Sequence, residues 1–303
     1  MAMGAADVVP GVSGGTIAFI TGIYERLLAA LQSINPKNII LLFRKGIKEF
    51  WEAIDGKFLS VLLGGIAISI LSLARGLTWL LHNKPILIWS FFFGLIFSSS
   101  WFVAKKVPQW DLGKGISLLA GVLIAFWIGT ISPAQGPDSL AYIFLSGMIA
   151  ICAMILPGIS GSFILLLMGS YSMILGAIGN LSSEPGASLL ILGVFMIGAI
   201  IGLLSFVRVL NFVFKKAHDQ TIAALTGFMI GSLGKVWPWK QTIETTVNRK
   251  GEIIPLVQEN LLPAAFQQQV GEPSQISMAI GLMLLGLVLV WGIEKLGNNN
   301  SEK

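Results

Sequence analysis

The sequence predicts an all-α integral membrane protein made of two inverted-topology repeats, each a re-entrant helical hairpin followed by three transmembrane helices. Two observations carry this prediction. The composition is 54% hydrophobic and only 12% charged, with a mean hydropathy of +0.81, whereas a soluble domain carries about 25% charged residues. The segment VVPGVSGGTIAFITGIYERLLAAL at 8–31 also returns as ILPGISGSFILLLMGSYSMILGAI at 155–178. A lipid bilayer is therefore the expected solvent, and duplication is the expected architecture.

The first repeat is expected to cover residues 1–134. It begins with a re-entrant hairpin at 1–31, whose first arm is a short stub. A helix over about 36–57 follows, and its pattern suits a helix that lies in the inner membrane interface. Its apolar residues recur at helical spacing with charges between them: Ile47, Phe50, Trp51, Ile54 and Phe58. Three apolar spans of roughly the required 20 residues then occur at 58–81, 86–103 and 113–131.

The second repeat is expected to cover residues 135–303. A hairpin at 140–178 opens it, and spans at 188–210, 219–237 and 275–293 follow. Between the last two spans lies an external insert at 238–274. The insert is polar and carries charges of both signs, which fits a lid over the membrane domain or a plain connecting loop.

Lysine and arginine predict the orientation in the membrane, because cytoplasmic loops carry an excess of them. The loops at 25–57, 104–114 and 208–218 and the tail from 294 hold 14, whereas 82–85, 132–139, 180–187 and 235–274 hold 5. The first set is therefore expected in the cytoplasm, together with both chain termini. Segment 140–178 must then enter and leave on the external face, with Pro157-Gly158 at its tip. We expect no cleavable signal peptide, because a basic start and a long apolar stretch are both missing.

The repeat extends well beyond the hairpins. Between 8–31 and 155–178, 9 of 24 positions are identical, at an offset of 147 residues. The following spans match at an offset of 133, which pairs Gly65 with Gly198, Arg75 with Arg208 and Gly94 with Gly227, among others. Three spans is an odd number, so the second half is expected upside down relative to the first. Inverted repeats with broken helices at mid-membrane are typical of secondary transporters.

The two Pro-Gly breaks indicate an anion site. Pro10-Gly11 and Pro157-Gly158 free backbone groups that cannot face lipid and are tolerated where they line a polar cavity. A helix that restarts after such a break presents N–H groups and a positive dipole end to an anion. The residues concerned are Ser13, Gly14 and Gly15 at the first tip and Ser160, Gly161 and Ser162 at the second. The alternative is that serine caps each helix and glycine allows close packing.

Charged and tyrosine residues near the tips supply further candidates. Arg75 and Arg208 are paired by the repeat, and guanidinium suits phosphate oxygens. Snorkelling to the interface is their alternative explanation. Asp7 and Glu25 are candidates for proton coupling, or else solvated interfacial charges, with Glu25 paired to Arg26. Tyr24 and Tyr171 could hydrogen-bond a head group, or form part of an interfacial aromatic belt.

Other functions find little support in the sequence. The net charge of +5 comes from loops between apolar spans, so it indicates topology and not nucleic-acid binding. Cys152 is the only cysteine, which excludes an intramolecular disulfide. His82 and His218 lie in separate loops, so we expect no metal site, and no motif indicates a cofactor. Small-residue faces would serve a homodimer as readily as internal packing.

At MGAADVVPGVSGGTIAFITGIYERLL and AMILPGISGSFILLLMGSYSMIL the chain resembles the PopT-type polyprenyl-phosphate transporters, a bacterial membrane family. The resemblance covers nearly the whole chain. It implies a translocase that returns undecaprenyl phosphate, the C55 lipid carrier of wall-polymer synthesis, from the outer to the cytoplasmic leaflet of the cell membrane. Its motif positions fall on Pro10, Gly11, Ser13, Gly14, Gly15, Thr16, Tyr24, Glu25, Pro157, Gly158, Ser160, Gly161 and Ser162.

Two rival functions stay open at the level of sequence. A transporter or channel for a small anion fits the same logic, because a helix N-terminus recognises the phosphate and not the lipid tail. An enzyme similar to the undecaprenyl-pyrophosphate phosphatases is the other. Those proteins resemble this chain in using inverted repeats, but their tip reads PG-x-S-R-S. Here Gly14 and Gly161 replace the arginine, and no pair of intramembrane glutamates is present to supply base chemistry.

Overall fold

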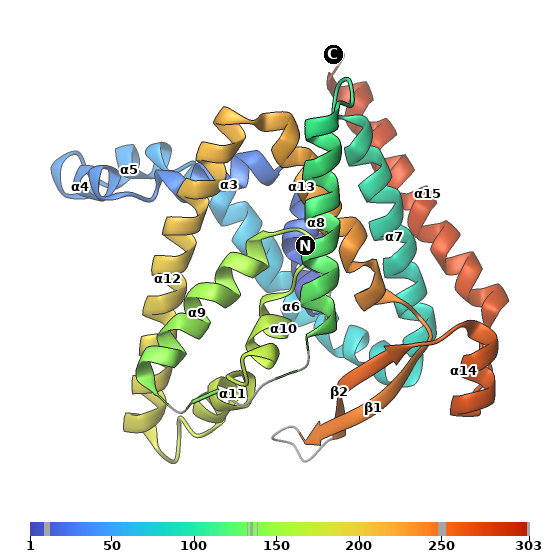
Figure 1. The fold of residues 1–303 in the computed structure, drawn as a ribbon. Helices are drawn as coiled ribbons and strands as arrows, with labels where there is room; N and C mark the ends of the chain where they lie inside the picture. Colours follow the sequence, from blue (N-terminus) through green and yellow to red (C-terminus); the bar gives the residue numbers. More distant parts are fainter. Residues whose placement is uncertain (9–12, 132, 134–135, 138, 248–252, 302–303) are drawn as a thin grey trace.

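The computed structural model describes residues 1–8, 13–131, 133, 136–137, 139–247 and 253–301 (Figure 1). The first half of the chain forms α1 (Ala2–Val8), α2 (Gly14–Ile20), α3 (Tyr24–Ser33), α4 (Pro36–Arg44), α5 (Ile47–Ala53), α6 (Gly56–Asn83), α7 (Pro85–Lys105) and α8 (Leu112–Thr130). The second half forms α9 (Leu140–Ile155), α10 (Gly161–Leu167), α11 (Tyr171–Gly179), α12 (Pro185–Lys216), α13 (His218–Gly231), a 3-10 helix (Ser232–Val236), β1 (Lys240–Val247), β2 (Ile253–Asn260), α14 (Pro263–Val270) and α15 (Ile276–Ser301).

The protein is a mostly helical membrane protein, as predicted. Among the described residues, α6, α7, α8 and α12 are long and apolar enough to cross a bilayer. The pair α10–α11 is bent by 108° and is apolar enough to be one broken span or a re-entrant loop, and α9 and α15 contain shorter apolar helices. Many large apolar side chains on α8 and α12 are exposed, which suits a protein whose surroundings are lipid.

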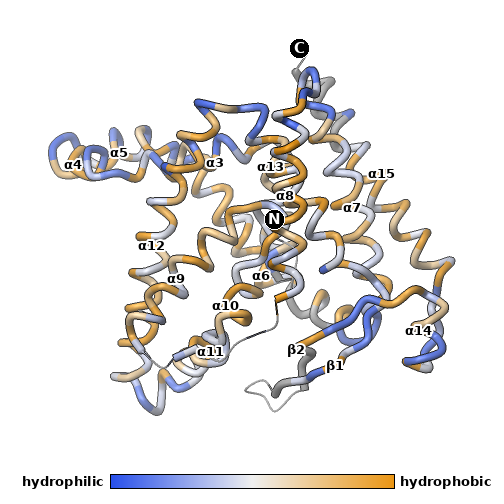
Figure 2. Tube along the Cα trace, in the orientation of Figure 1, coloured by the Kyte–Doolittle hydropathy of each residue, from blue (hydrophilic) through white to orange (hydrophobic). Residues whose placement is uncertain are grey.

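Polar residues gather at two opposite ends of the molecule, and apolar residues fill the space between them (Figure 2). At one end lie α3–α5, the α7–α8 and α12–α13 connections and the C-terminus (Figure 1). At the other lie the α6–α7 and α11–α12 connections, the β-strands and α14. We call these the basic end and the hairpin end. The chain starts between them, where Met1 is close to Gly65 of α6.

Glycines allow the long helices to pack closely. A Cβ added to Gly227 of α13 would lie 2.1 Å from the carbonyl oxygen of Leu118 in α8. Likewise, a Cβ on Gly94 of α7 would lie 2.1 Å from the carbonyl oxygen of Met283 in α15. Side chains there would force the helices apart, so these glycines determine the contacts of α8 with α13 and of α7 with α15.

The structure departs from the sequence expectations in three places. The segment 36–57 forms two short helices and not one, because the chain turns at Gly46, whose φ is 97°. Helix α13 ends at Gly231, and the 3-10 helix completes the segment 219–237. The insert 238–274 contains an antiparallel two-stranded sheet, in which Lys240 pairs with Asn260. The insert is anchored to the bundle by a small core of Ile86, Trp239, Phe266 and Ala279.

Candidate functional site

The second Pro-Gly break separates α9 from α10 and lies deep in the protein. Pro157 is fully buried, and Gly158 has a φ of 88°, which side chains rarely tolerate. A Cβ on Gly158 would also lie 2.7 Å from the carbonyl oxygen of Phe228 in α13. Both observations explain why the chain needs glycine at this position. Pro10 and Gly11 of the first break lie outside the described residues.

The first tip packs onto the second. The Ser13 hydroxyl donates to the carbonyl oxygen of Met154 at 2.9 Å. The Tyr24 hydroxyl donates to the carbonyl oxygen of Ile155 at 3.2 Å. Both carbonyls belong to the last turn of α9, where helical partners are missing. Two predicted residues of the first hairpin therefore satisfy backbone groups that the second break frees.

Two further contacts join the tips. The backbone N–H of Gly158 donates to the Thr16 hydroxyl at 2.9 Å. A Cβ on Gly15 would lie 2.5 Å from the carbonyl oxygen of Ile155, so only glycine permits this approach. Ser13, Thr16 and Tyr24 are all at most 2% exposed. The two tips are thus interlocked although the repeat places them 147 residues apart in the sequence.

An internal carboxylate occupies the N-terminus of α2. The N–H of Gly14 donates to Asp7 Oδ1 at 2.7 Å, and the N–H of Gly15 donates to the Ser13 hydroxyl at 3.1 Å. The sequence predicts free N–H groups here. The structure instead shows two of them held by the protein's own side chains, with Asp7 in the position of an anion.

No described contact places a carboxylate at the second tip. Met154 stands at the position that the repeat pairs with Asp7, and its Cβ lies 3.2 Å from the place of a Cβ on Gly161. Ser160 makes no side-chain cap to α10, and its hydroxyl is 2.9 Å from that of Ser162. A small cavity adjoins this tip, with Gly158, Ser160, Ser232 and Lys235 among its lining residues.

A larger cavity of about 390 Å³ continues from there toward the hairpin end. Its wall includes Phe126 and Gly129 of α8, Phe163 of α10, Lys235, Lys240 and Glu259. Sequence reasoning missed both lysines. Lys235 gave a signal, since it is a charge inside the apolar segment 219–237. Lys240 gave none, because it follows that segment and looks like an ordinary loop residue.

The remaining predicted residues are not brought to the tips by any described contact. Arg75 lies in α6, and its side chain is outside the described residues. Arg208 is exposed on α12, and Tyr171 is half-buried at the start of α11. Within the described ranges, no group of three His, Cys, Asp or Glu side chains could hold a metal ion.

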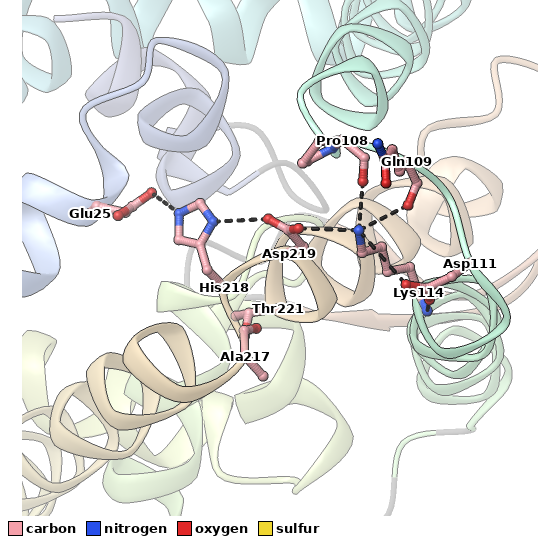
Figure 3. A network of polar contacts seen from close by, with 9 residues as sticks. All are labelled: Glu25, Pro108, Gln109, Asp111, Lys114, Ala217, His218, Asp219 and Thr221. Atoms are coloured by element: carbon pink, nitrogen blue, oxygen red, sulfur yellow. Dashed lines mark hydrogen bonds and ion pairs between the residues drawn. The ribbon is translucent and has the colours of Figure 1, made fainter.

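Glu25 joins a polar network at the basic end (Figure 3). Its carboxylate lies 3.2 Å from His218 Nε2, and His218 Nδ1 lies 3.3 Å from Asp219. The proposed pair of Glu25 with Arg26 is wrong, because Arg26 bonds Asp55 at 2.7 Å. Partial burial lowers the pKa of His218, but the two carboxylates raise it more, so the net shift is upward.

The same network continues to Lys114 at the start of α8. Its ammonium lies 3.2 Å from Asp219 and donates to the carbonyl oxygens of Pro108 and Gln109 at 2.5 and 2.9 Å (Figure 3). Lys114 is only 8% exposed. It is therefore a buried cation with all its hydrogen-bond donors engaged.

Comparisons with known proteins agree with the motif resemblance. A model of the VCA0040-like family, described as undecaprenyl phosphate translocase-like, matches residues 3–254. A polyprenyl-phosphate transporter of Vibrio cholerae is 47% identical over 97% of this chain and 94% of its own length. A polyprenyl-phosphate transporter of Staphylococcus aureus is 30% identical over 78% of this chain and 83% of its own length. No solved structure matches.

Proposed function

The chain belongs to the VCA0040-like, undecaprenyl phosphate translocase-like family, and from that premise we propose that it carries a polyprenyl phosphate across the bacterial cytoplasmic membrane. The substrate is undecaprenyl phosphate. The direction is from the outer leaflet to the cytoplasmic leaflet, which returns the lipid carrier to wall-polymer synthesis. The protein supplies binding and passage and performs no bond-breaking step.

The observation that carries this proposal is the interlocking of the two broken tips. Ser13 and Thr16 of one hairpin bond to Met154 and Gly158 of the other inside an apolar bundle. Irregular backbone at this depth is tolerated only where it is buried in protein or lines a cavity. Broken helices that meet between two repeats are where secondary transporters bind their substrates.

The packing of the long helices supports an inverted repeat. The repeat pairs α7 with α13 and α8 with α15, as second and third spans. If the halves are related in this way, the contact of α8 with α13 should have a counterpart in which α15 contacts α7. Both contacts are present. Gly94 and Gly227, which the repeat equates, lie at those two contacts. A two-fold relation between the halves accounts for both facts.

The distribution of basic residues supports the sidedness. The connections that hold most of the lysines and arginines lie together at the basic end (Figure 1), which we assign to the cytoplasm. The hairpin end, with the larger cavity, then faces outward. The head group would enter at that end, pass the tip at Ser160, Gly161 and Ser162, and leave toward Arg208. Arg75, in the external half of α6, would receive it first.

Binding to protein in nanodiscs tests the substrate. Undecaprenyl phosphate, undecaprenyl pyrophosphate and inorganic phosphate would be compared on the wild type, Arg75→Ala and Ser160→Ala, with exposed Ser60→Ala as control. We expect tight binding of the monophosphate lipid and much weaker binding of inorganic phosphate and of the pyrophosphate, with the lipid affinity reduced in both variants and kept in the control. Equal binding of inorganic phosphate would support a small-anion transporter, and release of phosphate from the pyrophosphate would support an enzyme.

A leaflet assay tests the transport step. Proteoliposomes carrying undecaprenyl phosphate with a reporter on its head-group side would show whether the lipid changes leaflet faster than in protein-free vesicles. Acceleration by the wild type is expected. Tight binding without acceleration would leave a lipid-binding protein and overturn the translocase.

A further inference from the structure

Two lysine side chains line the larger cavity at the hairpin end. Lys240 Nζ donates to the carbonyl oxygen of Lys235 at 2.5 Å and lies 4.0 Å from the centre of the Trp89 ring. Lys235 Nζ lies 4.3 Å from the centre of the Phe163 ring. Each cation is thus held against an aromatic face. Both side chains are partly buried, and both line the cavity.

Lys235 and Lys240 differ from Lys114, which has a carboxylate partner in Asp219. Among the described residues, no carboxylate oxygen lies within 4.0 Å of either ammonium. Glu259 is the acidic residue in the described wall, and its side chain is exposed. Burial and the neighbouring charge of Lys235 lower the pKa of Lys240 to about 7. Placing two like charges together in a partly dry cavity is unfavourable, and a bound anion would relieve the cost.

We propose that this cavity is the external receptor for the head group, where Lys235 and Lys240 together hold a phosphate monoester before it reaches the second tip. The inference rests on the proposed function for the identity of the lipid, but the anion site stands on the cavity and its two cations. Two ammonium groups can share the three terminal oxygens of one phosphate.

The shape of the cavity fits a lipid better than a free ion. Its volume of about 390 Å³ is in the range of ligand pockets, which starts near 300 Å³. Phe126 and Ile131 form part of its wall and are 60% and 37% exposed on the apolar outer surface of the bundle. A polyprenyl tail could leave the cavity past these side chains into the bilayer while the phosphate stays at the lysines.

The cavity also leads to the tip. Gly129, Phe163 and Lys235 line both this cavity and the smaller one beside Ser160. A Cβ on Gly129 would lie 3.3 Å from Cε of Lys235, so the lysine stem lies against the backbone of α8. Lys235 is therefore placed to keep contact with the phosphate as it moves from Lys240 toward Ser160.

The first test measures binding of undecaprenyl phosphate and of inorganic phosphate to protein in nanodiscs. Lys235→Gln and Lys240→Gln should each weaken binding of both probes about tenfold, and the double variant about a hundredfold or more. Lys235→Arg and Lys240→Arg should largely keep the affinity. Lys84→Gln is the control, because Lys84 is exposed at the same end and does not line the cavity.

The outcomes separate this inference from the proposed function. If the glutamine variants bind and transport undecaprenyl phosphate like the wild type, the receptor site is wrong and the translocase stands. If the wild type binds only inorganic phosphate and loses it in the double variant, the anion site stands and the lipid substrate is wrong. Thermal unfolding and size-exclusion profiles would identify any variant that fails to fold.

A second measurement needs no variant. A soluble amine-reactive ester, added to wild-type nanodiscs, should acylate Lys240 at pH 7.5 because a large fraction of its amine is then unprotonated. Saturating undecaprenyl phosphate should protect Lys240 and leave Lys84 unprotected, as read by peptide mass spectrometry. Equal acylation of Lys240 with and without lipid would overturn the proposal.

Discussion

The two tips have nearly the same sequence and different surroundings. At the first, Asp7 accepts from the N–H of Gly14, and Ser13 caps the same helix. At the second, Met154 replaces the acid, Ser160 makes no side-chain cap, and a cavity adjoins the break. The first tip is thus closed by a carboxylate of the protein itself, whereas the second tip is the one at which we propose that the substrate phosphate binds. A single side chain, Asp7 against Met154, distinguishes the two tips.

The lysines at the two ends of the molecule show the same contrast. Lys114 at the basic end contacts Asp219 and two carbonyl oxygens. Lys235 and Lys240 at the hairpin end both line the larger cavity, and neither has a described carboxylate partner. Partners offset the cost of burying a cation, whereas a partly buried cation without partners is costly and is a candidate for ligand binding. The contrast supports our proposal that the substrate binds at the hairpin end, while the network at the basic end is structural.

The largest expected effect comes from separating the tips. Gly15→Ala puts a Cβ 2.5 Å from the carbonyl oxygen of Ile155, so the hairpins must move apart. We expect loss of lipid transport and a fall of about 1–3 kcal/mol in the free energy of unfolding. Gly193→Ala is the matched control, since nothing lies within 4 Å of its added Cβ. Normal transport by Gly15→Ala would show that the tips need not interlock.

A carboxylate at the second tip should make the two tips alike. Met154→Asp places an acid beside Gly161, as Asp7 lies beside Gly14. We expect binding of undecaprenyl phosphate to fall about ten- to a hundredfold, because the new anion competes for the same N–H groups. Met154→Asn has a similar size without the charge and should bind more tightly than Met154→Asp. Equal affinities would mean that charge at this position does not affect the substrate.

Features that depend on neighbouring residues could be predicted from the sequence, whereas contacts between residues far apart in the chain could not. The second break and the four long apolar helices follow from local residue patterns, so the sequence predicted them. The interlocking of the tips was not predicted, because the partners of Ser13 and Tyr24 are backbone carbonyls more than 130 residues away. Lys240 becomes buried because it lies against Trp89, and Glu25 pairs with His218 across 193 residues. No local pattern encodes such neighbours, which only the packing of helices brings together.

The affinity for undecaprenyl phosphate should depend on pH because Lys240 contributes to the site. The pKa of Lys240 is about 7, so its amine is mostly charged below pH 7. Above pH 7 the amine is mostly neutral and must take up a proton when the phosphate binds. Lys235 and Glu259 also line the cavity. Since the second ionisation of a phosphate monoester lies near pH 6, affinity should peak between about pH 6 and 7 and fall up to tenfold per unit above. Lys240→Arg should abolish the fall, because arginine stays charged. A fall of equal size in Lys240→Arg would assign it to another group.

We expect the smallest effect from changing the polar network of Glu25, His218 and Asp219 at the basic end. The pKa of His218 is raised above its unfolded value by Asp219 and Glu25, against a lowering by burial. Its stabilising contribution is therefore fully present below the unfolded pKa of about 6.5 and is lost as the pH rises through the folded value. Solvent screens these exposed side chains, so the wild type should exceed His218→Gln in Tm by only about 1–3 °C at pH 5.5.

That difference should vanish at pH 8.5, where the imidazole is neutral in both states. Binding of undecaprenyl phosphate at the hairpin end should be the same in His218→Gln and the wild type at either pH, because the network lies at the opposite end of the bundle (Figure 1). A Tm difference that grew with pH would contradict the assigned shift. A change in lipid affinity in His218→Gln would show that the two ends are energetically coupled. The basic end would then take part in controlling substrate binding and would not be purely structural.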